Sequence, residues 1–235
     1  MMMDDKESPI DILINATKKI SPTLIYYEIG SNFELFTYDL IEKSFSHFEN
    51  VIVISFYDAF NLIYQYWKLN ISNEKLNKII EKIKVISVNS IVENELLNSY
   101  VVSLTTPTTL LNEIARLADE ANGKKTLILI LGMDIYTIYQ NEETFAKLYS
   151  LLIVPTSKYE NMKIISAINP KIFSQKTTEL ISSYSFNVAY LGIEALKKEF
   201  ARYLKFLRIA FLEYTLKKWI YQIIGVNLVF TEAVP

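Results

Sequence analysis

The segment Thr126–Leu131 (TLILIL) contains no charged residue and ends directly at Gly132. A short apolar run of this kind is typical of a parallel strand that helices cover on both faces of its sheet. The run is far shorter than the ~18 apolar residues that a membrane span needs. The sequence therefore predicts a sheet with a layer of helices on each side.

Strand-like and helix-like segments alternate along the chain on both sides of this run. Strands are predicted at residues 23–28, 51–56, 85–88, 126–131, 162–168 and 187–191. Amphipathic helices are predicted at residues 8–20, 33–45, 58–69, 74–82, 108–122, 142–152 and 175–184. This alternation favours a three-layer α/β fold with one open, mostly parallel sheet. We expect one domain over residues 1–235, with an N-terminal helix within residues 1–21.

Two stretches of the chain have a less regular pattern. Residues 90–107 show no clear periodicity, and a long loop is predicted there. Residues 203–211, 216–224 and 227–231 fit strands, although parts of them also fit a helix. We expect residues 200–235 to form C-terminal edge strands that extend one side of the sheet and run antiparallel.

The composition excludes several kinds of catalytic site. The chain has no Cys, a single His (His47) and only five Gly. Without Cys there is no disulfide framework, zinc knuckle or cysteine nucleophile, and a Ser-His-Asp triad would depend on His47 alone. Five scattered glycines leave no Gly-rich phosphate loop. We therefore assign no catalytic residue, no metal site and no cofactor.

Ligands of such folds bind at the carboxyl ends of the strands. The first of these ends is followed by the turn Gly30-Ser31-Asn32, and no Lys occurs between Lys19 and Lys43. A phosphate loop needs several glycines, a Lys and a Ser or Thr for magnesium. We interpret this segment as an ordinary turn in which Ser31 or Asn32 caps the following helix.

Two further strand ends carry carboxylates. Asp58 follows the strand at residues 51–56 and can act as a base or, by our preference, as a helix cap. After Thr126–Leu131, Gly132 stands where a magnesium-organising carboxylate would follow, and Asp134 lies two residues beyond. Asp134 can face the crevice or cap a turn, and the sequence leaves both open. If Glu28, Asp58 and Asp134 converge, they can hold a divalent cation.

The charge of the chain is unevenly distributed. The net charge is −2, yet residues 196–235 carry seven Lys or Arg against three Glu, and the rest has six more acidic than basic residues. Candidate nucleic-acid contacts in this segment are Lys205, Arg208, Lys217 and Lys218, with Trp219 and Tyr221 as stacking rings. The simpler interpretation is a solvated face.

The N-terminus is acidic and lacks the apolar region of a signal peptide. Because no segment is apolar enough to span a membrane either, we expect a cytoplasmic protein without membrane contact.

The order of elements resembles the RecA/KaiC-like branch of the P-loop ATPases. Residues 23–45 look like its first strand, phosphate loop and first helix, and residues 126–134 look like its Walker B strand. Residues 51–58 (VIVISFYD) resemble a strand that ends in a Ser-Phe-Glu-Glu type motif, in which Asp58 matches the second acidic position. Residues 201–230, which include Arg202, Lys205 and Arg208, are similar to the C-terminal strands of that branch.

The chain departs from this family at the positions that handle nucleotide. The phosphate-loop Lys and Ser/Thr are missing, Gly132 replaces the Walker B Asp, and Tyr57 replaces the first acidic residue. The resemblance therefore implies the fold and not the activity, as in archaeal proteins of unknown function that share this fold with a lost phosphate loop.

The main functional hypothesis is a non-catalytic protein that acts through protein–protein contacts, as a partner or regulator of a paralogous ATPase or as a homo-oligomer. One alternative is a nucleic-acid-binding accessory protein that uses the basic C-terminal segment. Another is a protein that binds a metal or a nucleotide weakly at the strand ends.

Overall fold

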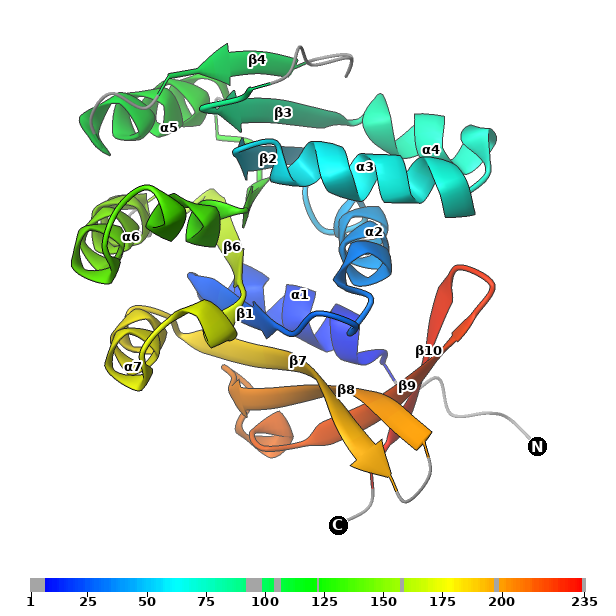
Figure 1. The fold of residues 1–235 in the computed structure, drawn as a ribbon. Helices are drawn as coiled ribbons and strands as arrows, with labels where there is room; N and C mark the ends of the chain where they lie inside the picture. The colour runs from blue at the N-terminus through cyan, green and yellow to red at the C-terminus, as the bar shows by residue number, and fades with distance from the viewer. Residues whose placement is uncertain are drawn as a thin grey trace.

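The computed structural model describes residues 7–91, 99–103, 107–121, 123–156, 159–196 and 199–233. These residues form a ten-stranded sheet in the order β10-β9-β8-β7-β1-β6-β5-β2-β3-β4, with helices on both faces (Figure 1). The strands are β1 (Thr23–Tyr27), β2 (Asn50–Phe56), β3 (Ile83–Val88), β4 (Ser99–Val102), β5 (Thr126–Leu131), β6 (Met162–Ile168), β7 (Asn187–Leu196), β8 (Glu199–Arg208), β9 (Lys218–Ile224) and β10 (Asn227–Glu232). The α-helices are α1 (Pro9–Lys19), α2 (Phe33–Ser44), α3 (Ala59–Asn70), α4 (Asn73–Ile80), α5 (Pro107–Ala121), α6 (Glu142–Thr156) and α7 (Gln175–Ser183).

Most of the sheet is parallel. From β7 through β1, β6, β5, β2 and β3 to β4, every neighbouring pair of strands is parallel. The last three strands, β8, β9 and β10, are added antiparallel at the β7 side. The predicted three-layer α/β fold with antiparallel C-terminal strands is confirmed, and the helical alternative for the C-terminal segment is excluded.

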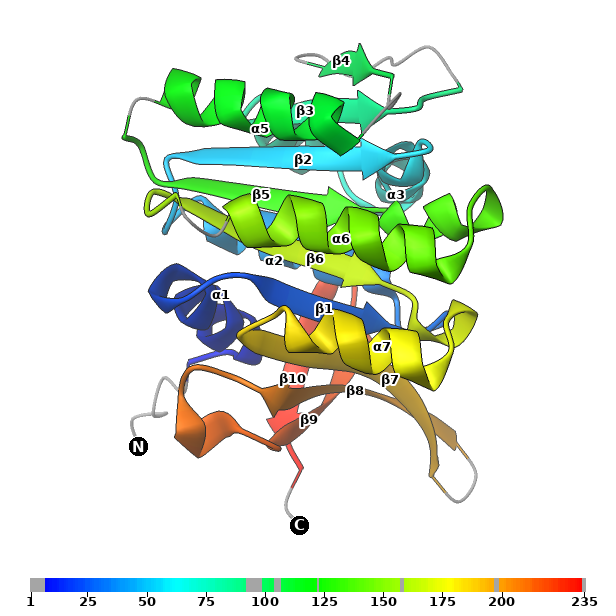
Figure 2. The ribbon, with the colours of Figure 1, turned by 90° about the vertical axis from the view of Figure 1, so that its left-hand side faces the viewer.

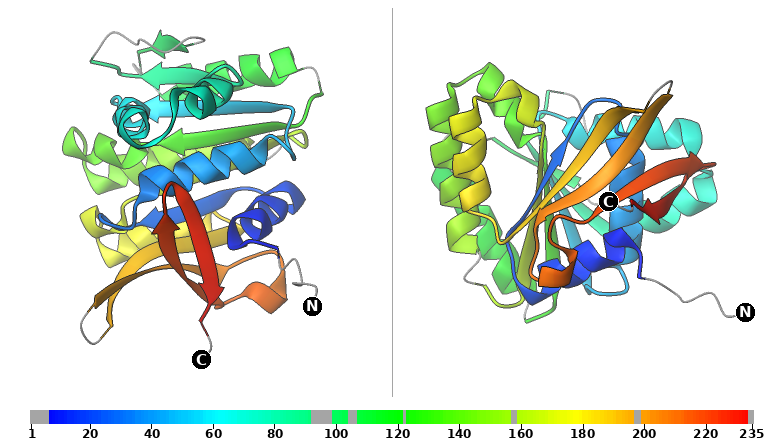
Figure 3. Two further views of the ribbon diagram at one scale, coloured as in Figure 1. Left: turned by 90° about the vertical axis from the view of Figure 1, so that its right-hand side faces the viewer. Right: turned by 90° about the horizontal axis from the view of Figure 1, so that it is seen from below.

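The two faces of the sheet are covered by different helices (Figure 2 and Figure 3). In β5, Leu127, Leu129 and Leu131 belong to the core formed with α1 to α4. Ile128 and Ile130 belong to the core formed with α5 to α7. The apolar run is thus a strand buried on both faces, as its sequence predicts.

The C-terminal strands bend away from the parallel part, and the β9–β10 hairpin lies against α2 (Figure 3). Trp219 and Tyr221 of β9 and Leu228 of β10 are buried in the same core as α1 and α2. The hairpin therefore packs on the helix α2, which follows the turn after β1.

Three local features differ from the prediction. Strand β4 lies inside the stretch predicted as a long loop, where residues 92–98 and 104–106 are outside the described residues. A 3₁₀-helix, η1 (Met133–Ile138), follows β5, and β7 runs to Leu196 rather than ending at 191. Strand β4 has only four residues, too few for a periodic signal, and β7 is long because β8 pairs with it. Among the described helices, none has the length and apolar character required to cross a membrane.

Candidate functional site

The strand ends considered above meet at one edge of the sheet, which we call the carboxyl edge; it lies at the arrowheads of β1, β5 and β6 in Figure 2. From β1 the chain continues into α2 on one face, and from its neighbour β6 it continues through η2 (Pro170–Ile172) into α7 on the other. Neighbouring strands whose connections leave toward opposite faces create the crevice in which such folds bind ligands.

The turn after β1 is folded tightly on itself. Ser31 is fully buried, and both its backbone N–H (3.1 Å) and its Oγ (2.7 Å) donate to the Glu28 carbonyl. Gly30 has a φ of +90°, and a Cβ at this position would lie 2.6 Å from Cδ1 of Ile193. The turn is therefore pressed against β7 and does not form an open cradle for a phosphate.

Side chains from distant parts of the chain fill the space around this turn. The ring of Phe33 stacks on Tyr27 with 4.1 Å between the ring centroids. The Tyr221 hydroxyl donates to the Ser31 carbonyl, and Nε of Arg202 donates to the Gly30 carbonyl at 3.0 Å. The C-terminal strands thus contact the turn after β1 directly.

Neither predicted capping side chain caps α2. Asn32 holds the cap position with left-handed backbone (φ 55°), but no side-chain hydrogen bond reaches the helix. Its Nδ2 donates to the Tyr66 hydroxyl at 3.3 Å, and its Oδ1 is buried with no hydrogen-bond partner among the described residues. Ser31 donates backward to Glu28 instead, so the capping prediction is wrong for both residues.

Glu28 holds three elements together at the carboxyl edge. Its carboxylate accepts from the Tyr190 hydroxyl (2.7 Å) and pairs with Nζ of Lys171 (3.1 Å). Burial alone raises the pKa of Glu28, but the hydrogen bonds from Tyr190 and Lys171 outweigh it, and the pKa lies below its usual value. Glu28 is therefore an ionised anchor between β1, η2 and β7.

Asp58 links the ends of β2 and β3. Tyr57 and Asp58 both have left-handed backbone (φ 47° and 61°). This turns the Asp58 carboxylate to accept from Ser90 Oγ and from the Ile91 N–H (2.8 Å). Helix α3 is capped by Ser55, whose Oγ accepts from the Phe60 N–H at 2.9 Å. The preferred interpretation of Asp58 as a cap of this helix is therefore wrong.

The close packing after β5 leaves no room for a side chain at position 132, so only Gly fits there. Its φ is +71°, and a Cβ would lie 2.3 Å from the Ala59 Cβ and 2.7 Å from the Phe56 carbonyl oxygen. No carboxylate side chain fits at this position unless both α3 and the end of β2 move.

Asp134, in the first turn of η1, is only 3% exposed. Its Oδ2 accepts from the Asn169 N–H at 2.9 Å, and its Oδ1 is buried without a partner in the described part of the chain. Burial raises the pKa of Asp134, and burial together with this carboxylate raises the pKa of the Tyr27 phenol. Asp134 is therefore buried between the ends of β6 and β1 and does not lie on a surface turn.

The three carboxylates do not converge. Glu28 is bound by Tyr190 and Lys171, Asp58 by the segment after β3, and Asp134 by the segment after β6. No group of three possible metal ligands occurs within the described ranges. The hypothesis of a divalent cation on these three residues is therefore wrong for the structure as described.

The carboxyl edge also exposes apolar side chains, which the sequence did not single out. We call them the apolar edge residues; each is between 45% and 86% exposed. They are Ile29 after β1, Leu62 in the first turns of α3, Ile91 after β3, Ile138 and Tyr139 at the end of η1, Ile172 in η2 and Phe200 at the start of β8. Single exposed apolar residues are common on any protein surface. These residues are of interest because they all lie at the same edge of the sheet.

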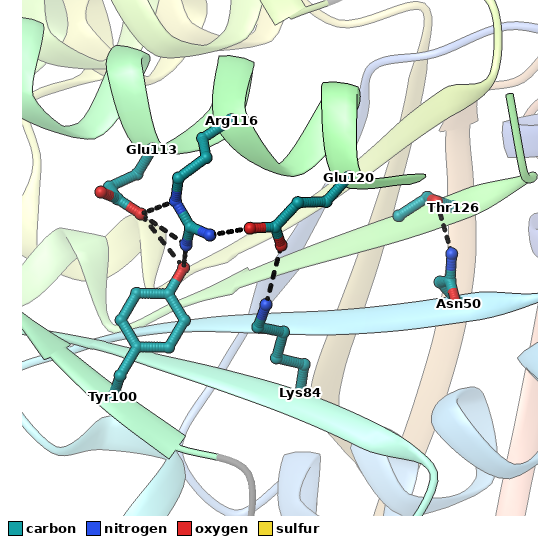
Figure 4. A network of polar contacts seen from close by, with 7 residues as sticks. All are labelled: Asn50, Lys84, Tyr100, Glu113, Arg116, Glu120 and Thr126. Carbon is teal, nitrogen blue, oxygen red and sulfur yellow. Dashed lines mark hydrogen bonds and ion pairs between the residues drawn. The ribbon is translucent and has the colours of Figure 1, made fainter. Parts of the chain in front are cut away.

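A polar network lies between α5 and the outer strands (Figure 4). Arg116 of α5 binds Glu113 (2.9 Å), Glu120 and the Tyr100 hydroxyl (2.6 Å), and Lys84 of β3 binds Glu120 (3.1 Å). A cavity of about 520 Å³ adjoins it, lined by the amino-terminal parts of β2, β3 and β4 and the last turn of α5. Every charge of this network has an opposite charge beside it, so the network fastens β4 to α5 and needs no ligand.

The basic residues of the C-terminal strands are also held internally. Lys217 pairs with Glu232 at 3.1 Å, Lys218 pairs with Glu194, and Arg208 donates to the Ser182 and Ser185 carbonyls. Trp219 and Tyr221 are buried, so the prediction that their rings stack on bases is wrong. Lys205 is half-buried on β8.

Comparisons with known proteins identify the fold. No family model and no curated protein sequence matches the chain. The KaiC-like protein PH0186 of the hyperthermophilic archaeon Pyrococcus horikoshii OT3 is similar in structure, with a TM-score of 0.63 and 14% identity over 89% of this chain and 88% of that one. The structure of PH0250 from the same organism gives a TM-score of 0.64 and 11% identity over 86% and 95% of the two chains. The RecA/KaiC-like fold implied by the resemblance is confirmed, while identities this low carry no information on activity.

Proposed function

We propose that this protein is a non-catalytic member of the RecA/KaiC-like fold that acts through protein–protein contacts, as a partner or regulator of a related ATPase or with further copies of itself. One observation carries the proposal. The strand ends at which this fold would handle a nucleotide are occupied by the chain's own side chains, with Tyr221 and Arg202 bound to the turn at Gly30 and Ser31.

The chemistry of the turn supports the absence of phosphate binding. Phosphates at a helix N-terminus are held by free backbone N–H groups and by a nearby cation. Here the Ser31 N–H is already bound to Glu28, and the Lys171 ammonium is paired with the Glu28 carboxylate. A phosphate beside that carboxylate would be repelled by about 1 kcal/mol even at the dielectric constant of water.

The apolar edge residues support the second half of the proposal. Apolar side chains that gather at one edge and stay exposed mark a contact surface more often than isolated ones do. At this edge they lie near the strand ends at which such folds bind ligands, and this surface is here suited to a protein.

Isothermal titration calorimetry with Mg-ATP, together with a phosphate-release assay, tests the proposal. We expect no heat of binding at micromolar concentrations and no turnover above the buffer rate. Micromolar binding or clear turnover would refute the non-catalytic assignment.

A further inference from the structure

The connection from β6 to α7 is bound to the rest of the molecule mainly through carboxylates. We call residues 169–174 the strap; it contains η2 and leads from the carboxyl end of β6 to the start of α7 (Figure 2). Asp134 of η1, Glu28 after β1 and Glu142 of α6 each bind one part of it. Carboxylates from three separate elements therefore fasten one short segment.

Two of these contacts hold the first half of the strap. The Asn169 N–H donates to Oδ2 of Asp134 at 2.9 Å, and Nζ of Lys171 pairs with Oε1 of Glu28 at 3.1 Å. The Asn169 side chain accepts from the Lys171 N–H at 3.0 Å, so the two contacts are linked within the strap. A movement of one end of η2 therefore strains the contact at the other.

The third carboxylate holds the end of the strap. Glu142 accepts from the Ser174 N–H at 3.0 Å and from its Oγ at 2.7 Å. It also accepts from Oγ1 of Thr177 in the first turn of α7 at 2.5 Å. This carboxylate therefore ties the start of α7 to the first turn of α6.

Few other contacts hold the strap in place. None of the residues of η2 is buried. In the described part of the chain, no backbone-to-backbone hydrogen bond joins residues 170–173 to another element; the Phe173 N–H donates to the Pro170 carbonyl inside the strap. The Phe173 ring packs on Phe145 with 4.7 Å between the ring centroids. Segments with so little buried apolar area open at a lower free energy than the core does.

Two of the carboxylates hold the strap less well in acid. The pKa of Glu28 lies below its usual value, because its hydrogen bonds outweigh the effect of its burial. Hydrogen bonds from Thr177 and Ser174 lower the pKa of Glu142. Both contributions are therefore present above the usual value of 4.5 and are lost as the pH falls through the folded-state pKa values.

Asp134 responds to pH in the opposite direction. Its Oδ1 is buried and has no hydrogen-bond partner among the described residues. Burial raises the pKa of Asp134 above its usual value of 3.8. The closed strap keeps this carboxyl buried, so the closed state loses stability as the pH rises through the raised pKa.

Few neighbouring groups change their charge over the same pH range. The titratable and charged groups beside these carboxylates are Tyr27 at Asp134, Lys171, Tyr190 and Tyr203 at Glu28, and Glu143, Lys147 and Lys176 along the groove at Glu142. Phenols and ammonium groups titrate near pH 10, so Glu143 is the member of this set that also titrates in acid.

We propose that the strap opens as one unit before the rest of the chain unfolds, and that pH controls this opening. Protonation of Glu28 and Glu142 opens it on the acid side, and ionisation of Asp134 opens it on the alkaline side. Opening brings water to Oδ1 of Asp134. The strap is a conformational device in addition to the proposed function and does not depend on it.

Hydrogen exchange measured by NMR over a series of pH values tests the strap. We expect the amides of Asn169 and Ser174 to have equal protection, on the order of 100-fold below that of Ile128 and Ile130 in β5. We expect this protection to be greatest at intermediate pH and to fall on both sides.

Glu142→Gln should lower the protection of Asn169 and Ser174 alike by about 10-fold, because it removes a charged acceptor from a single opening unit. Glu143→Gln is the matched control: it makes the same change of charge in the same helical turn, and Glu143 has no hydrogen bond to the strap within the described ranges. We expect less than about a 2-fold change there.

Asp134→Asn keeps an acceptor for the Asn169 N–H and has no charge to bury. We expect this variant to retain its protection as the pH rises, while the fall in acid remains. The protection of the β5 amides verifies that each variant is folded.

Strap amides as protected as those of β5 would overturn the proposal, as would a response to Glu142→Gln at Ser174 without one at Asn169. Equal effects of Glu142→Gln and Glu143→Gln, or an unchanged pH profile in Asp134→Asn, would overturn it as well. None of these results depends on binding or hydrolysis of Mg-ATP, which tests the proposed function separately.

Discussion

The carboxyl edge and the α5 network expose different kinds of side chain. In the α5 network the exposed groups are charged, and Arg116, Glu113, Glu120 and Lys84 satisfy one another. At the carboxyl edge the carboxylates of Glu28 and Asp58 are bound within the chain, and several large apolar side chains are exposed. A solvent-exposed ion pair needs no further partner, because each charge already faces its opposite. Covering exposed apolar area, in contrast, lowers the free energy. The two regions therefore differ in the kind of side chain that they leave exposed to solvent.

The largest expected effect comes from the close packing beneath that edge. Gly132→Ala places a Cβ against Ala59 and the Phe56 carbonyl at positive φ. We expect the free energy of unfolding in urea to fall by about 2 to 5 kcal/mol, from overpacking plus the left-handed backbone. Gly225→Ala is the control, because Gly225 also has positive φ but open space around it; there we expect about 1 kcal/mol. Equal losses would mean that the edge is not closely packed.

A second test separates two carboxylates of the crevice by their pH dependence. The pKa of Glu28 is lowered in the folded chain, so its contribution to stability is present above its usual value of 4.5 and is lost as the pH falls through the folded-state pKa. The pKa of Asp134 is raised above its usual value of 3.8, so the folded chain loses stability as the pH rises through the folded-state pKa.

Glu28→Gln should therefore lower the free energy of unfolding at neutral pH by about 1 to 3 kcal/mol, and this loss should shrink in acid. Asp134→Asn keeps an acceptor for the Asn169 N–H and should stabilise the protein at neutral pH, with a gain that also shrinks in acid. Urea titrations at a series of pH values measure both. The same sign for the two variants at neutral pH would contradict the assigned environments.

A smaller effect is expected in the α5 network. Arg116→Ala removes ion pairs that are close to solvent, and we expect a loss of at most about 1 kcal/mol. High salt should reduce the difference from the wild type, which thermal melts at two salt concentrations can measure. A loss as large as that of Gly132→Ala would mean that the ion pairs of the α5 network contribute as much to stability as the close packing at the carboxyl edge.

The smallest expected effect concerns nucleic acid. Lys217→Glu combined with Lys218→Glu removes two cations that Glu232 and Glu194 already neutralise. We expect no change in the fluorescence anisotropy of a labelled duplex mixed with the protein. A wild-type affinity that falls steeply with salt and disappears in the double variant would support the nucleic-acid alternative instead.

Much of the fold could be predicted from local patterns. The helix that begins at Pro9 was predicted because Ser8 is a suitable cap, and Ser8 Oγ does accept from the Asp11 N–H. The buried strand at Thr126 was predicted from its apolar run. Strand β4 was missed because four residues that pair only with β3 carry almost no periodic signal.

The candidate site was predicted less well, because its contacts join residues far apart in the chain. Asp58 was expected to cap the helix next to it, yet its partners lie beyond β3 at Ser90 and Ile91. Tyr221 was considered for base stacking, yet it is buried against the turn at Ser31. Contacts across such distances depend on how the strands are ordered in the sheet, which residue spacing does not reveal.

The sequence by itself determined the α/β alternation, the buried central strand and the loss of the phosphate-loop residues, because periodicity and side-chain chemistry are local properties. Only the tertiary structure decided that Tyr221 of β9 binds the turn at Ser31, and that the packing around Gly132 leaves no room for a side chain. It also decided that the exposed apolar residues of separate loops share one edge, since parallel strands bring all their carboxyl ends to the same side of the sheet.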